Sequence, residues 1–90
     1  MKQLPNKNEE NDSKLFELRA LRNRARKRRA NYELEQAQQL YTKAIDVAKE
    51  LKSKEDVEKL ENIVIKIDLD LFLKRLETME QDLSQMEWLE

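Results

Sequence analysis

The side chains of this chain that could do chemistry are mainly guanidinium groups, and they are crowded into one short segment. Seven of the eleven positions from 19 to 29 are basic. They are Arg19, Arg22, Arg24, Arg26, Lys27, Arg28 and Arg29. Arginine is always charged and forms paired hydrogen bonds with phosphate and carboxylate groups. The segment is therefore a candidate surface for binding an acidic partner.

The formal net charge of the 90-residue chain, −1, conceals this segment. Residues 1–29 carry ten Lys and Arg against four Asp and Glu, a balance of +6. Residues 30–90 carry eight against fifteen, a balance of −7. Such an asymmetry is typical of a protein that binds something acidic.

Three interpretations of the basic segment stay open. In the first, it binds DNA or RNA, because arginines around a helix neutralise phosphates and release counterions; base stacking adds little, since Tyr32 is the nearest aromatic residue. In the second, it binds an acidic protein, including the acidic remainder of a second copy. In the third, it is a solvated helix end or, in a eukaryotic protein, a nuclear-import signal. We expect a nucleic-acid-binding accessory or regulatory factor, with a protein-interaction adaptor as the alternative.

The sequence contains few of the residues that usually catalyse reactions or bind metals. The chain has no histidine and no cysteine, and these side chains do most acid–base and nucleophilic catalysis at neutral pH. Asp68 and Asp70 are two residues apart, so they do not share one face of a helix. No glycine is available to build a phosphate-binding loop. We therefore expect no enzymatic activity, no cofactor, no metal and no small-molecule substrate.

The chain also lacks the sequence signals of membrane insertion and secretion. No apolar run approaches the roughly 20 residues that span a bilayer, so we expect no transmembrane segment. The first residues, 1–5, lack the apolar stretch of a signal peptide. We expect an intracellular protein, cytoplasmic or, in a eukaryote, nuclear.

The absence of glycine and the single proline, Pro5, favour a helix-rich chain, because hairpin turns need residues with positive φ. Residues 1–12 are polar, and we expect them to form a disordered tail. Residues 13–90 should form one helical domain, with helices at about 13–30, 32–52 and 54–88. Asn31 is a plausible break and N-cap between the first two helices, although these could also be continuous. Ser53 and Asp56 have capping-box spacing for the third helix.

Apolar residues recur at helical spacing along the second and third helices. The stripe of the second helix contains Leu34, Ala37, Tyr41, Ala44, Ala48 and Leu51. The third helix begins with Val57, Leu60, Val64, Ile67 and Leu71. About a third of a turn away, its stripe continues with Phe72, Leu76, Met79, Leu83 and Met86. A helix whose apolar face rotates either contacts different neighbours along its length or bends around one.

The segment from 63 to 73 is less typical of a helix. Its apolar residues alternate with period two, which is typical of a strand. A lone strand has no partner in the rest of the chain unless two copies pair. The segment also runs directly into Lys74 and Arg75 without turn residues. We therefore favour a helix and keep the strand as the alternative.

Residues 31–80 resemble a known helical module. The run from Asn31 to Ile45 is similar to the second helix of MIT (microtubule-interacting and transport) domains and of tetratricopeptide repeats. The run from Phe72 to Glu77 resembles the later part of the third MIT helix. The resemblance implies a three-helix bundle that binds a peptide in a groove near Leu40, Ala44, Val64 and Leu71. The basic first helix and two extra residues between Tyr32 and Ala37 depart from the family pattern.

These observations predict an all-α protein in which an antiparallel helical hairpin is joined by a basic N-terminal helix. The helices should form a three-helix bundle or a dimer with a four-helix core. The rotating stripe favours a homodimer, because a lone chain would leave large apolar side chains in water. The expected protein interface contains Leu40, Ala44, Val64, Leu71, Phe72, Leu76, Met79 and Leu83.

Overall fold

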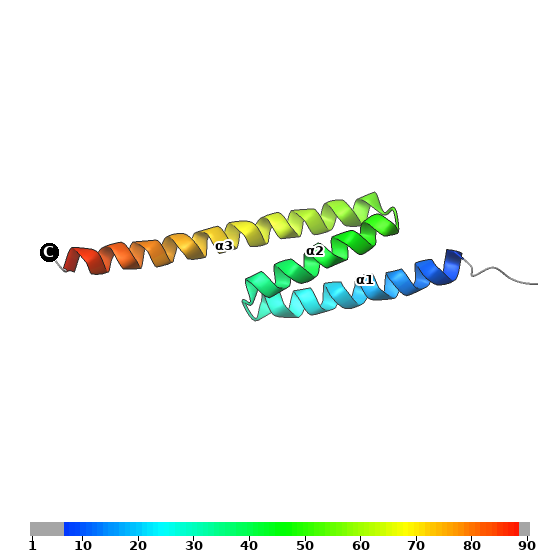
Figure 1. Cartoon of the computed structure of the whole chain (residues 1–90), viewed down its shortest axis with the longest axis horizontal. Helices are drawn as coiled ribbons and strands as arrows, with labels where there is room; N and C mark the ends of the chain where they lie inside the picture. The colour runs from blue at the N-terminus through cyan, green and yellow to red at the C-terminus, as the bar shows by residue number, and fades with distance from the viewer. Residues whose placement is uncertain (1–6, 89–90) are drawn as a thin grey trace, which may run out of the picture.

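The computed structural model describes the backbone of residues 7–88 and the side chains of residues 11–85. Three α-helices follow one another: α1 (Lys7–Ala30), α2 (Leu34–Glu50) and α3 (Lys54–Trp88). No strand occurs within residues 7–88. Sequential helices run antiparallel (Figure 1). The prediction of an all-α protein is confirmed, and the segment from 63 to 73 is helical rather than a strand.

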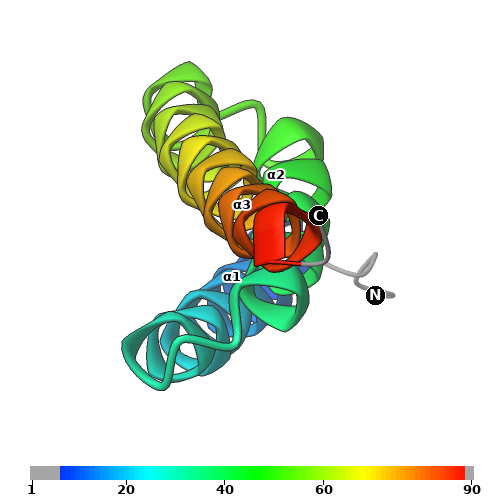
Figure 2. The ribbon, with the colours of Figure 1, turned by 90° about the vertical axis from the view of Figure 1, so that its left-hand side faces the viewer.

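The central helix of the structure is α2, which packs against α1 on one side and against α3 on the other. The axes of α1 and α3 diverge from each other at an angle (Figure 2), and their backbones make no close approach. α3 has 35 residues and α2 has 17; at 1.5 Å per residue, α3 is about 25 Å longer. Its C-terminal half therefore extends beyond the rest of the structure (Figure 1). We call residues 72–88 the arm.

The helix boundaries differ from the predicted ones at three places. α1 begins at Lys7, six residues before the predicted start, so residues 7–12 belong to a helix and not to the tail. Nothing between Pro5 and Ser13 is incompatible with a helix, which is why the sequence permits the earlier start. Residues 1–6 of the predicted tail lie outside the described residues. α2 is shorter at both ends than the predicted 32–52, because turns occupy those positions.

Both turns end the preceding helix in the same way. Tyr32 and Lys52 have positive φ, 63° and 59°. In the first turn, the Glu33 N–H donates to the Arg28 carbonyl at 2.8 Å, and the Tyr32 N–H donates to the Arg29 carbonyl at 2.9 Å. These two bonds form a Schellman motif. The prediction that Asn31 caps α2 is therefore wrong: Asn31 belongs to the end of α1, and α2 begins after Glu33 without a side-chain cap.

The start of α3 is capped as the sequence predicts. The Ser53 hydroxyl accepts a hydrogen bond from the Asp56 N–H at 3.4 Å and donates one to the Asp56 carboxylate at 2.9 Å. The capping pair satisfies one of the free N–H groups at the helix N-terminus.

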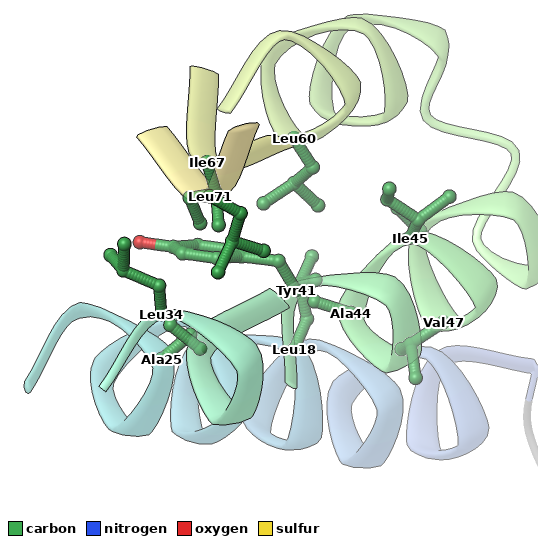
Figure 3. Close-up of a cluster of buried hydrophobic side chains, with 12 residues drawn as sticks. Leu18, Ala25, Leu34, Tyr41, Ala44, Ile45, Val47, Leu60, Ile67 and Leu71 are labelled. Carbon is green, nitrogen blue, oxygen red and sulfur yellow. The ribbon is translucent and has the colours of Figure 1, made fainter. Parts of the chain in front are cut away.

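The hydrophobic core lies on both sides of α2 (Figure 3). Tyr41 lies between the helices and is 4% exposed. From α3, Leu60 and Ile67 are fully buried. The complete set of buried residues is Leu18, Ala25, Leu34, Ala37, Tyr41, Ala44, Ile45, Val47, Ala48, Leu60, Ile67 and Leu71. Each large side chain buried here stabilises the fold by about 1.5–3 kcal/mol, and beyond Leu71 no described side chain is buried.

Candidate functional site

The predicted basic residues surround the C-terminal half of α1 on the sides that do not pack on α2. We call this surface the basic face; it consists of Arg19, Arg22, Arg24, Arg26, Lys27, Arg28 and Arg29. Leu18 and Ala25 fix this part of α1 against α2, with 2% and 0% exposure. The charged residues occupy the remaining circumference. Five of them are exposed, whereas Arg22 and Arg29 are half-buried.

Helical spacing divides the basic face into two sides. Arg19, Arg22, Arg26 and Arg29 follow one another at intervals of three, four and three residues, which places them in one row along α1. Arg22 in this row reaches Asp56 at the start of α3, so the row lies on the side of α1 that is turned toward α3. Arg24 and Arg28, four residues apart, lie on the opposite side.

Few carboxylates neutralise the basic face. Arg28 forms an ion pair with Glu33 at 3.0 Å, and Arg22 approaches Asp56 at 4.0 Å. Among the described side chains, the other five basic residues have no carboxylate oxygen within 4.0 Å. Exposed ion pairs of this kind contribute little to stability. The charge of the basic face is therefore available to a partner.

A second surface feature is an apolar row on α3. It contains Ile65, Leu69, Phe72, Leu76, Met79 and Leu83, which are 40–62% exposed. We call this row the apolar stripe. Four of its members were predicted interface residues; Ile65 and Leu69 were missed, because they belong to the alternating segment that resembles a strand. Extending the spacing of Phe72 and Leu76 toward the N-terminus would have found them.

The other predicted interface residues lie elsewhere. Ala44 is fully buried and Leu71 is 9% exposed, so both belong to the core around α2. Leu40 and Val64 are partly buried and pack against that core. Ala44 and Leu71 are therefore covered by the chain's own helices, whereas Val64 also lines an open depression between α2 and α3. The structure thus separates the eight predicted interface residues into a core group and an exposed group.

An open depression of about 720 Å³ lies between α2 and α3. Its lining is Thr42, Ile45, Asp46, Lys49, Glu58, Glu61, Asn62, Val64 and Ile65. This lining contains charges of both signs, and within the described residues no group of three or more carboxylates could hold a metal ion. Asp68 accepts a hydrogen bond from Gln38 of α2, which gives it a structural contact.

No helix among the described residues is long and apolar enough to cross a membrane. Compared with known proteins, the chain matches no family model, no curated protein and no solved structure. We therefore classify the chain by its own structure. It is an all-α protein that carries a basic face on α1 and an apolar stripe on α3. The resemblance to MIT domains and tetratricopeptide repeats stays a prediction.

Proposed function

We propose that the chain is a non-enzymatic nucleic-acid-binding accessory or regulatory protein, and that the basic face of α1 binds the phosphate backbone. The observation that carries this proposal is the accumulation of exposed basic side chains without neighbouring carboxylates. Each phosphate that such a side chain neutralises releases condensed counterions, and this release drives binding. The same contacts position a protein on nucleic acid without reading its sequence.

The geometry of α1 also supports binding to the phosphate backbone of a nucleic acid. From Arg19 to Arg29 the helix rises about 15 Å, a length over which one strand of DNA carries roughly four phosphates. Because Leu18 and Ala25 hold this part of α1 on α2, the charges are presented by a fixed helix. Less conformational freedom is then lost on binding than for a disordered basic tail.

A second candidate function is the binding of an acidic helix of a protein. The arm supplies the observation that favours it: Glu77, Glu80 and Asp82 are exposed, and no basic residue occurs from 76 to 85. An acidic helical surface of this kind is complementary to the basic face. The partner in this alternative is a protein segment with an acidic helical surface like that of residues 76–85.

The deciding experiment measures binding to fluorescent duplex DNA, single-stranded DNA and RNA by anisotropy across a salt series. The test variant replaces Arg19, Arg26 and Arg29 by Gln, since all three lie in one row along α1 and make no ion pair among the described side chains. If each contacts one phosphate, the slope of log K against log salt on duplex DNA becomes shallower by about 2.7, which is three times 0.9.

The matched control replaces Lys43, Lys49 and Lys54 by Gln, which changes the net charge equally but leaves the basic face intact. The control should keep the original slope. An equal loss of slope in the control would contradict the proposal, because binding would then follow net charge alone. No binding to any of the three nucleic acids at low salt would favour the acidic-helix alternative, which an acidic peptide copying residues 76–85 then tests.

A further inference from the structure

The apolar stripe has no partner among the described residues. Its members from Phe72 onward lie on the arm, where no described side chain is buried. A single helix of this length is marginal in water, because helices in proteins owe most of their stability to packing. The body of the protein cannot supply that packing, since Leu34 at the start of α2 lies near Leu71 of α3 (Figure 3) and the arm extends past it (Figure 1). The arm therefore needs a partner from outside the chain.

The spacing of the stripe specifies what kind of partner fits. Successive members are separated by four, three, four, three and four residues, which is the 3.5-residue period of a two-stranded coiled coil. Two full alternations and one further spacing of four residues, from Ile65 to Leu83, keep this period. The residues of α3 that pack on α2, such as Leu60 and Ile67, lie about 140–160° around the helix from the centre of the stripe. The stripe consequently faces away from α2 and is free along its whole length.

The charges beside the stripe point to a second copy in parallel orientation. In a parallel pair, the residue directly before the first core position of a heptad faces the residue five positions later in the other helix. The first core positions are Leu69, Leu76 and Leu83, so Arg75 lies opposite Glu80 of the second copy and Asp68 lies opposite the uncharged Leu73. One heptad before Asp68, Glu61 lies opposite Lys66 of the second copy. Both charged pairs have opposite charge, and their side chains are exposed.

The antiparallel arrangement is less favourable. The register that uses all six members of the stripe pairs Ile65 with Leu83, Leu69 with Met79 and Phe72 with Leu76. It brings Arg75 against its own counterpart and Asp68 against Asp82, while only Lys66 and Glu80 attract. Like charges across a coiled coil select against a pairing.

We propose that two copies of this chain pair through the apolar stripe of α3 as a parallel, in-register coiled coil from Ile65 to Leu83. The pairing does not use the basic face, so it is independent of the proposed nucleic-acid binding. The α1 and α2 helices of the two copies lie on opposite sides of the pair, because each α2 packs on the side of α3 that is turned away from the stripe. The arms continue beyond them as a two-stranded stalk.

The first test measures the mass of the full chain by light scattering. We expect twice the 10.9 kDa of one chain. Leu76→Asp should give the monomer mass, because it places a carboxylate in the centre of the stripe. Gln81→Asp, a matched change on the opposite side of the arm, should leave the dimer intact. A monomeric unmodified chain, or a dimer that survives Leu76→Asp, would overturn the proposal.

The second test fixes the orientation and uses the absence of cysteine from the chain. In the parallel pair, Leu83 meets its own counterpart, so Leu83→Cys should form an intermolecular disulfide under mild oxidation. The antiparallel register instead places Leu83 against Ile65. A mixture of Ile65→Cys and Leu83→Cys chains that cross-links mainly between the two variants would therefore contradict the parallel arrangement.

Discussion

Tyr32 and Lys52 carry a backbone conformation that glycine usually provides, in a chain that contains no glycine. For a non-glycine residue, the left-handed conformation costs about 1–2 kcal/mol. Each residue ends a helix and allows two backbone hydrogen bonds that close the turn. Tyr32 gains a further contact, because the Lys74 ammonium lies 5.8 Å from the centre of its ring. Among the described residues, Lys52 makes no such contact, so its strain has less compensation.

At the scale of single residues, we predict that Lys52→Gly stabilises the protein. Glycine removes the steric cost at positive φ, and its own entropic cost of about 0.5–1 kcal/mol offsets part of the gain. We expect the free energy of unfolding in urea to rise by about 0.5–1 kcal/mol. The matched control, Lys43→Gly in the exposed middle of α2, should lower it by about 1 kcal/mol. A lower stability for Lys52→Gly would show that the left-handed conformation carries no strain here.

At the scale of the elements, α2 is the helix on which the other two depend. Three of its alanines, Ala37, Ala44 and Ala48, have no exposed surface. Small side chains permit close approach of two helices, and α2 makes such an approach on both sides. The small side chains of these alanines therefore set the distance from α2 to α1 and the distance from α2 to α3.

The prediction for α2 is that Ala44→Leu is strongly destabilising. The added volume must displace either neighbouring helix, and overpacking of this kind costs about 1–3 kcal/mol. Thermal and urea unfolding would measure the loss. Lys43→Leu adds a leucine to the exposed neighbouring position and should change the stability by less than about 0.5 kcal/mol. Equal losses in the two variants would contradict the close approach around Ala44.

The helices themselves could be predicted from the sequence because each depends on a local signal. The spacing of Leu60, Ile67 and Leu71 shows the buried face of α3, and Ser53 with Asp56 shows its start. The turn at Tyr32 could not be recognised, because no local propensity favours a positive φ at tyrosine. Its conformation follows from the packing of the helices on either side, which acts over longer distances in the chain.

The two surfaces were predicted to different degrees. The basic face was apparent from composition alone, since a run of arginines remains exposed in almost any fold. The interface residues were harder to sort, because an apolar residue at helical spacing can lie in the core, as Ala44 does, or on a free face, as Met79 does. Only the length of α3 relative to α2 separates these cases, and sequence periodicity does not reveal how far one helix extends past another.

On the scale of the whole molecule, stability is divided unevenly along the chain. The core ends at Leu71, so the body formed by α1, α2 and residues 54–71 holds every described buried residue. The arm has helical hydrogen bonds but no described buried side chain. Local opening is easiest where buried apolar contacts are few. The arm of a single copy should therefore open much more readily than the body.

This division predicts how hydrogen exchange should depend on protein concentration. Amides of α2 should exchange slowly at every concentration, because opening them requires loss of the core. Amides from 74 to 85 should exchange rapidly in dilute protein and slow down at concentrations at which the coiled coil forms, since pairing stabilises the arm by mass action. Leu76→Asp should keep these amides in rapid exchange at all concentrations while α2 stays protected. Protection of the arm that does not change with concentration would mean that the arm is stable without a second copy.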